Sequence, residues 1–140
     1  MRKQTPGKGG LSVLVVDDDR AIGKLLRLNL EGSGTRVIEA ASGLECINAL
    51  QQSPVDLVLL DVRLPDFSGW GVLSLLRLTE SLRDIPVIVV SEEPPNTTLM
   101  ERLKPDDYIQ KPFDMRDLLL RVTRVAGARS TRKKTADQAG

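Results

Sequence analysis

The sequence predicts an α/β domain, a doubly wound parallel sheet of five strands with helices on both faces. Short β-branched, apolar runs alternate five times with helix-like stretches, and this alternation is typical of parallel sheets. Three of the runs are almost continuously apolar, as expected for strands that helices cover on both sides. The five runs are residues 12–17 (SVLVVD), 35–40 (TRVIEA), 56–61 (DLVLLD), 86–91 (PVIVVS) and 107–111 (DYIQK).

The stretches between these runs carry signals for the start and end of helices. The first stretch ends at the Gly-Ser-Gly of residues 32–34. Ser42 and Glu45 have the spacing of a capping box for the second helix. Ser68 is expected to cap a leucine-rich helix that ends near residue 79, and Asp114 to cap the last helix.

The fourth helix is predicted to be short or disrupted. Prolines stand at positions 94, 95 and 105. Because proline is not tolerated inside a helix, only about two turns fit between them.

The length and composition indicate a single domain in a reducing compartment. The 140 residues suffice for one sizeable core, and one cysteine, Cys46, excludes an internal disulfide. We expect that thiol to be buried in the core without a redox role. No apolar run reaches the ~18 residues that a membrane span needs, and the first ten residues lack an apolar signal region. We therefore expect a cytoplasmic protein without membrane association.

Charge is unevenly distributed along the chain. The two ends hold seven of the 20 basic residues and one acidic residue, Asp137. This composition favours disordered tails at residues 1–10 and 127–140, the second being a basic tail or a truncated linker, around a domain at 11–126.

Carboxylates gather where the predicted strands end. Asp17 and Asp18 follow the first strand and Asp61 ends the third, while Ser91 ends the fourth and Lys111 the fifth. In open α/β sheets, ligands bind beyond the carboxyl ends of the strands where the chain order reverses. If the first and third strands are neighbours there, the carboxylates form one acidic pocket. Such an oxygen-only site favours a hard cation such as Mg²⁺.

A pocket with these groups suits a phosphoryl group. The cation and the Lys111 ammonium would neutralise its oxygens, and the Ser91 hydroxyl would donate to it. Asp61 is ionised at neutral pH and is a credible nucleophile for an acyl phosphate.

The segments VLVVDDD, LVLLDVRLPDFSG, VIVVS and DYIQKPF resemble the receiver (response-regulator) domain of bacterial two-component signalling. The resemblance runs in register over nearly all of residues 11–126. It implies a flavodoxin-like (βα)5 fold with strand order 2-1-3-4-5.

The same resemblance assigns roles to the acidic residues. Asp61 would accept a phosphoryl group from a histidine kinase. Asp18 and Asp61 would bind Mg²⁺ directly and Asp17 often through water, while the backbone carbonyl of Arg63 completes the protein ligands. Asp19 matches no position of the family's site and is expected to cap the first helix.

Further positions match the residues that respond to phosphorylation in the family. Ser91 takes the position of the switch Ser/Thr, Tyr108 that of the switch aromatic residue, and Lys111 that of the lysine that pairs with phosphate. The Lys111–Pro112 bond is usually cis in the family.

Three features depart from the family pattern. Glu92 stands where a small residue is usual and is expected to slow phosphoryl transfer from small anionic donors. Arg63 and Glu93 occupy positions that tune dephosphorylation, and we expect them to pair across the pocket mouth. The short fourth helix puts in doubt dimerisation through the face that relatives use for docking.

We expect a stand-alone or excised receiver that, when phosphorylated, controls a downstream protein partner or a missing output domain, as a monomer or weak dimer. Its donor would be a histidine kinase or phosphotransfer protein. A related alternative is a receiver excised from a winged-helix DNA-binding regulator, because residues 104–122 resemble such receivers; the missing output domain would then lie beyond the chain. No DNA-reading helix is evident, so specific nucleic-acid binding by this chain is not expected.

A remote alternative is a phosphatase of the haloacid-dehalogenase type. Its Asp-x-Asp signature would make Asp17 the nucleophile and Asp19 the acid. That hypothesis leaves Asp61 without a role, and the later acidic pair Asp106-Asp107 is poorly placed for it.

Overall fold

Five parallel strands form one sheet in the order β2-β1-β3-β4-β5. The structure is a computed structural model that describes residues 10–139. Each strand lies within one of the five predicted runs, and the strand order confirms the predicted doubly wound, flavodoxin-like topology. The strands are β1 (Ser12–Val16), β2 (Arg36–Ala40), β3 (Leu57–Asp61), β4 (Val87–Ser91) and β5 (Asp107–Gln110).

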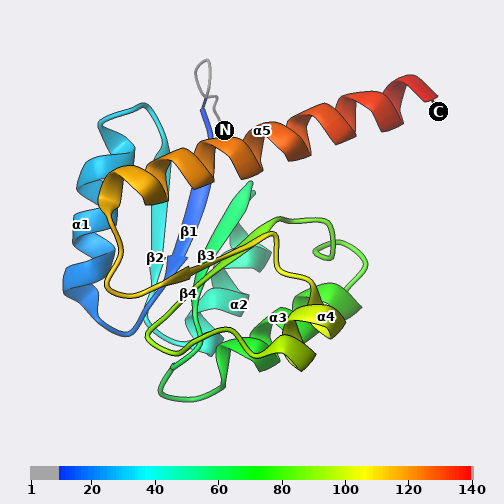
Figure 1. The fold of residues 1–140 in the computed structure, drawn as a ribbon. Helices are drawn as coiled ribbons and strands as arrows, with labels where there is room; N and C mark the ends of the chain where they lie inside the picture. Colours follow the sequence, from blue (N-terminus) through cyan, green and yellow to red (C-terminus); the bar gives the residue numbers. More distant parts are fainter. Residues whose placement is uncertain (1–9, 140) are drawn as a thin grey trace.

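Helices cover both faces of the sheet (Figure 1). Two of them, α1 and α5, pack against one face, and the other three lie on the opposite face. The helices are α1 (Arg20–Glu31), α2 (Gly43–Gln52), α3 (Gly69–Leu78), α4 (Thr97–Leu103) and α5 (Met115–Ala139).

The alternation of side chains along each strand creates two separate cores. In β1, Val13 and Val15 point to the core beneath α1 and α5, whereas Leu14 and Val16 point to the core beneath α2 and α3. Because both sets are buried, the strand needs apolar residues at every position. Cys46 is fully buried in the second core, and burial raises the pKa of its thiol to about 12. The thiol is therefore protonated at neutral pH.

The predicted caps hold the helix starts. The Asp19 carboxylate accepts from the amide of Ala21, and Asp114 accepts from those of Arg116 and Asp117. Ser68 accepts from the amide of Trp70. These bonds satisfy amides that have no partner within the helix.

The capping box of α2 differs from the expected form. Ser42 accepts from the amide of Glu45, as predicted, but the Glu45 carboxylate accepts from the amide of Ala41 rather than that of Ser42. A second carboxylate, that of Asp66, accepts from the amides of Gly43 and Leu44 at distances of 2.8 and 2.9 Å.

The fourth helix is as short as the prolines predict. It spans seven residues, none of them fully buried, between the cap Asn96 and Lys104, whose φ of 48° lies in the left-handed region. The Arg77 guanidinium of α3 donates to the carbonyls of Leu103 (3.1 Å) and Lys104 (3.2 Å). Because these carbonyls end α4, the arginine fixes α4 to α3.

The last helix is longer than expected. It runs to Ala139, so the structure places helix where the sequence analysis expects a disordered tail or linker at 127–140. Residues 128–139 contain no proline or glycine and include three Ala, two Arg and two Lys, which favour helix; the charge pattern does not reveal this propensity. The predicted tail at 1–10 lies, apart from residue 10, outside the described residues, and the domain limits remain a prediction.

Among residues 10–139, no helix combines the length and apolarity that crossing a bilayer requires.

Candidate functional site

Three carboxylates meet at the carboxyl ends of β1 and β3. One ligand oxygen each from Asp17, Asp18 and Asp61 lies within 4.8 Å of the others. β1 and β3 are neighbours, with Val16 opposite Leu60, so the residues that follow them emerge side by side. Asp17 and Asp61 are buried and Asp18 is exposed, which leaves the cluster open to solvent on one side.

Backbone amides fix the orientation of the two buried carboxylates. Oδ1 of Asp17 accepts from the amide of Asp19 at 2.9 Å, and Oδ1 of Asp61 accepts from the amide of Arg63 at 3.1 Å. Their Oδ2 atoms face the ammonium of Lys111, at 2.8 Å from Asp17 and 3.3 Å from Asp61. The Lys111–Pro112 bond is cis, in agreement with the resemblance.

Burial and charge shift the pKa values of this group. Burial raises the pKa of Asp61, and the nearby Asp17 carboxylate adds to the rise, while the amide of Arg63 and the Lys111 ammonium oppose it. Burial alone would lower the pKa of Lys111, but its contacts with Asp17 and Asp61 outweigh that effect and raise it. The lysine is therefore protonated at neutral pH and offsets only part of the negative charge.

The donor set fits a hard divalent cation. The cluster offers carboxylate oxygens, and the chain contains no histidine. Mg²⁺ prefers such ligands and keeps several waters, for which the exposed side at Asp18 leaves room. One lysine against three carboxylates leaves a negative charge that a cation would balance.

The hydroxyl of Ser91 lies at the end of the adjacent strand. Ser91 is 1 % exposed, and its Oγ accepts from the amide of Glu93 at 3.0 Å. The Tyr108 hydroxyl, from β5, donates to the carbonyl of Glu93 at 2.5 Å. The two predicted switch residues therefore contact the same residue of the β4–α4 segment.

The expected pair at the pocket mouth forms. Nη2 of the Arg63 guanidinium lies 3.0 Å from Oε2 of Glu93. Both side chains are substantially exposed, so the pair lies at the surface over the carboxyl ends of β3 and β4. Glu92 beside it is exposed, and its carbonyl accepts from the amide group of Gln110.

The structure brings Asp17, Asp18, Asp61 and Lys111 together, whereas Ser91 and Tyr108 contact Glu93 beside them. Asp19 turns away to cap α1, as expected, which removes the second acid that the haloacid-dehalogenase hypothesis requires.

Sequence reasoning missed two supports of the site. Gly69 packs so tightly on β3 that a Cβ atom there would lie 2.1 Å from the carbonyl oxygen of Asp61. The rings of Trp70 and Tyr108 stack with centroids 6.3 Å apart. No sequence signal predicts either contact, because each depends on how α3 packs against a strand distant in sequence.

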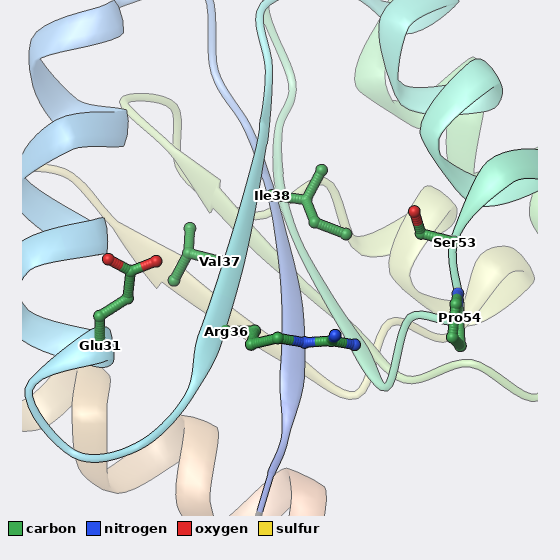
Figure 2. Close-up of a pocket in the computed structure, with 6 residues that line it drawn as sticks. All are labelled: Glu31, Arg36, Val37, Ile38, Ser53 and Pro54. Atoms are coloured by element: carbon green, nitrogen blue, oxygen red, sulfur yellow. The ribbon is translucent and has the colours of Figure 1, made fainter. Parts of the chain in front are cut away.

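A pocket of about 280 Å³ lies elsewhere, around the amino end of the edge strand β2 (Figure 2). Arg36 and Ile38 line it from the strand, Ser53 and Pro54 from the segment after α2. Because the carboxylates lie at the carboxyl ends of the strands, this pocket is not part of their site.

Comparison with known proteins agrees with this geometry. The family model described as the response regulator receiver domain matches residues 13–123. The transcriptional regulatory protein KdpE of Mycobacterium tuberculosis is 39% identical over 128 residues, which cover 90% of this chain and 55% of KdpE. PhoP of Bacillus subtilis, named an alkaline phosphatase synthesis transcriptional regulatory protein, is 38% identical over 110 residues, covering 79% of this chain and 46% of PhoP.

Solved structures show the same fold. The CheY-like receiver domain protein of Methanospirillum hungatei superposes with a TM-score of 0.82 at 27% identity, covering 88% of this chain and 98% of that one. The chain spans about half the length of the curated regulators that it matches. Motifs, strand order and family match agree: the chain belongs to the response regulator receiver domain family of two-component signalling.

Proposed function

We propose that this receiver domain takes a phosphoryl group onto Asp61 from a phosphohistidine of a histidine kinase or phosphotransfer protein. The observation that carries the proposal is the convergence of Asp61 with Asp17, Asp18 and Lys111 at one end of the sheet. A nucleophilic carboxylate, a cation site and an ammonium within a few ångströms are the groups that phosphoryl transfer needs.

The proposed metal is Mg²⁺, held by Asp18, Asp61 and the carbonyl of Arg63, with Asp17 acting through water. Bound there, Mg²⁺ would neutralise charge on the phosphoryl oxygens. The chain itself orients the acceptor: the amide of Arg63 holds Oδ1 of Asp61, and the ammonium of Lys111 faces Oδ2.

In the proposed step, a carboxylate oxygen of Asp61 attacks the phosphorus atom. The new O–P bond forms as the P–N bond to the donor imidazole breaks, and the electron pair of that bond stays on the nitrogen. No proton must leave Asp61, because an ionised carboxylate is already nucleophilic. Lys111 and Ser91 would then contact the phosphoryl oxygens.

Phosphorylation would act on the surface around β4, α4 and β5. When the Ser91 hydroxyl turns to the phosphoryl group, the amide of Glu93 loses its present acceptor. The β4–α4 segment is then free to move, and Tyr108 with it, because the tyrosine hydroxyl holds the same residue. A partner that prefers the new arrangement would read the signal.

The relatives named as transcriptional regulators support a second part of the proposal. The chain covers about half of each relative. We therefore propose that its phosphorylation regulates a DNA-binding output, which is either part of a longer protein or a separate partner.

Phosphotransfer from a panel of histidine kinases tests the proposal, with Asp61→Asn as the negative control. Asp19→Asn is a matched control, because asparagine also caps a helix and residue 19 lies outside the cluster. We expect a kinase to label the wild type and Asp19→Asn within minutes and to leave Asp61→Asn unlabelled. Equal labelling of Asp61→Asn would contradict the proposal.

A further inference from the structure

The ring of Tyr108 is stacked on the ring of Trp70. The centroids are 6.3 Å apart and the planes differ by 21°. These are the single tyrosine and the single tryptophan of the chain. They come from β5 and from the first turn of α3, and both pack against the core beneath α2 and α3. The separation lies within the range of attractive aromatic pairs.

Trp70 is fixed to the strand that carries Asp61. Its amide donates to Oγ of Ser68, and the amide of Gly69 donates to the carbonyl of Val62 at 2.7 Å. A Cβ atom at Gly69 would lie 2.1 Å from the carbonyl oxygen of Asp61. The start of α3 therefore cannot move far without moving the end of β3.

Tyr108 is fixed at its other end to the segment that follows β4. Its hydroxyl donates to the carbonyl of Glu93, whose amide donates to Oγ of Ser91. The Glu93 carboxylate pairs with Arg63, whose own amide donates to Asp61. These contacts form a closed ring that joins Asp61, Arg63, Glu93, Tyr108 and Trp70.

We propose that Trp70 is a positioning residue of the switch. By stacking on Tyr108 it stabilises the ring position in which the hydroxyl holds Glu93, and so it favours the arrangement without phosphate. The inference rests on the proposed function, because it concerns the response to phosphate at Asp61. Loss of an aromatic stack is expected to change an equilibrium by about twofold to tenfold.

The single tryptophan provides the first test. Tryptophan emission is measured while the wild type is titrated with Mg²⁺ and beryllofluoride, an analogue of the acyl phosphate. We expect a change in emission as Tyr108 leaves Trp70. In Tyr108→Leu the stack is absent from the start, so the titration should leave the emission nearly constant.

Three variants provide the second test. Trp70→Leu removes the stack, Trp70→Phe keeps an aromatic ring, and Leu82→Ala removes apolar packing from the same core while leaving both rings of the stack in place. The apparent Kd for beryllofluoride, followed by NMR of the backbone amides, is expected to fall by about twofold to tenfold in Trp70→Leu. The other two variants should stay within twofold of the wild type.

Parallel labelling by acetyl phosphate, measured by intact-protein mass, distinguishes a failure of the role of Trp70 from a failure of the proposed function. A labelled wild type with unchanged emission, or a Trp70→Leu affinity equal to that of Leu82→Ala, would overturn the role of Trp70 alone. A wild type that takes up neither phosphate nor beryllofluoride would overturn the proposed function and this inference together.

Discussion

Nη2 of Arg63 lies 3.0 Å from Oε2 of Glu93, and this ion pair joins the segments that follow β3 and β4. The amide of Arg63 donates to Asp61, and the amide of Glu93 donates to Ser91. The pair therefore links the proposed phosphoryl acceptor to the proposed switch residue. It lies at the surface over the carboxyl ends of β3 and β4, where we expect it to hinder a water that would hydrolyse an acyl phosphate.

Breaking the pair should shorten the lifetime of the phosphoryl group. In Arg63→Ala the contact is lost, and in Glu93→Gln the ion pair is weakened to a neutral hydrogen bond, so water is expected to reach Asp61 more easily. We expect the rate of dephosphorylation to rise about twofold to fivefold, a modest effect because exposed ion pairs are weak. The decay of labelled protein after removal of the donor measures this. Arg124→Ala, which breaks a surface pair with Asp107, is the control; equal lifetimes in all variants would refute the expectation.

Removing the carboxylate of Glu92 should speed labelling by small anionic donors. Glu92 is exposed next to Arg63 and Glu93, and its charge repels an approaching acetyl phosphate. Labelling of Glu92→Ala is expected to be roughly twofold to fivefold faster at low ionic strength, with a smaller gain in salt. Glu101→Ala on α4 carries the same change of charge and serves as the control. If both variants label at one rate, local repulsion is not the cause.

Two glycines of α3 should respond oppositely to alanine. At Gly69 a Cβ atom would lie 2.1 Å from the backbone of Asp61, whereas at Gly71 it would meet nothing within 4 Å. We expect Gly69→Ala to lower the free energy of unfolding by roughly 1–3 kcal/mol and to slow labelling. Gly71→Ala should raise that free energy by up to about 1 kcal/mol, because alanine favours helix.

Urea unfolding of the two variants measures both changes. A Gly69→Ala protein as stable and as active as the wild type would show that the contact between α3 and β3 does not position Asp61.

Asp66 should stabilise the protein only while it is ionised. Desolvation opposes ionisation, but the amides of Leu44, Gly43 and Phe67 donate to the carboxylate and lower its pKa. Since the folded state has the lower pKa, the stabilisation is complete above the unfolded value of ~3.9 and is lost as pH falls through the folded value. The thermal unfolding temperature of Asp66→Ala should lie a few degrees below that of the wild type at neutral pH. The difference should shrink in acid; a difference independent of pH would exclude this origin.

Most of the fold could be predicted from the sequence alone. Strands covered on both faces need apolar residues at every position, as in residues 57–60, and such runs are visible without a structure. Caps such as Asp19 and Asp114 are also visible, because a few residue types suit that position. The length of α5 was missed because helix propensity beyond residue 126 was outweighed by a charge pattern typical of tails.

The site was predictable in its chemistry but not in its supports. Asp17, Asp61 and Lys111 stand at strand ends, and the parallel sheet brings strand ends together. The stack of Trp70 on Tyr108 depends on the distance between α3 and β5. The hydrogen bond from the amide of Gly43 to Asp66 depends on the approach of two segments 23 residues apart. Such contacts follow from tertiary packing, which leaves no local trace in sequence.

The most direct test of the account is to identify the residue that carries phosphate. The protein is incubated with acetyl phosphate, with and without Mg²⁺, reduced with borohydride to convert the aspartyl phosphate to homoserine, and mapped by peptide mass spectrometry. We predict modification of Asp61 alone, dependent on Mg²⁺ and absent in Asp61→Asn. Modification at Asp17, or uptake at Asp61 that is equal after removal of all divalent cations, would contradict the account.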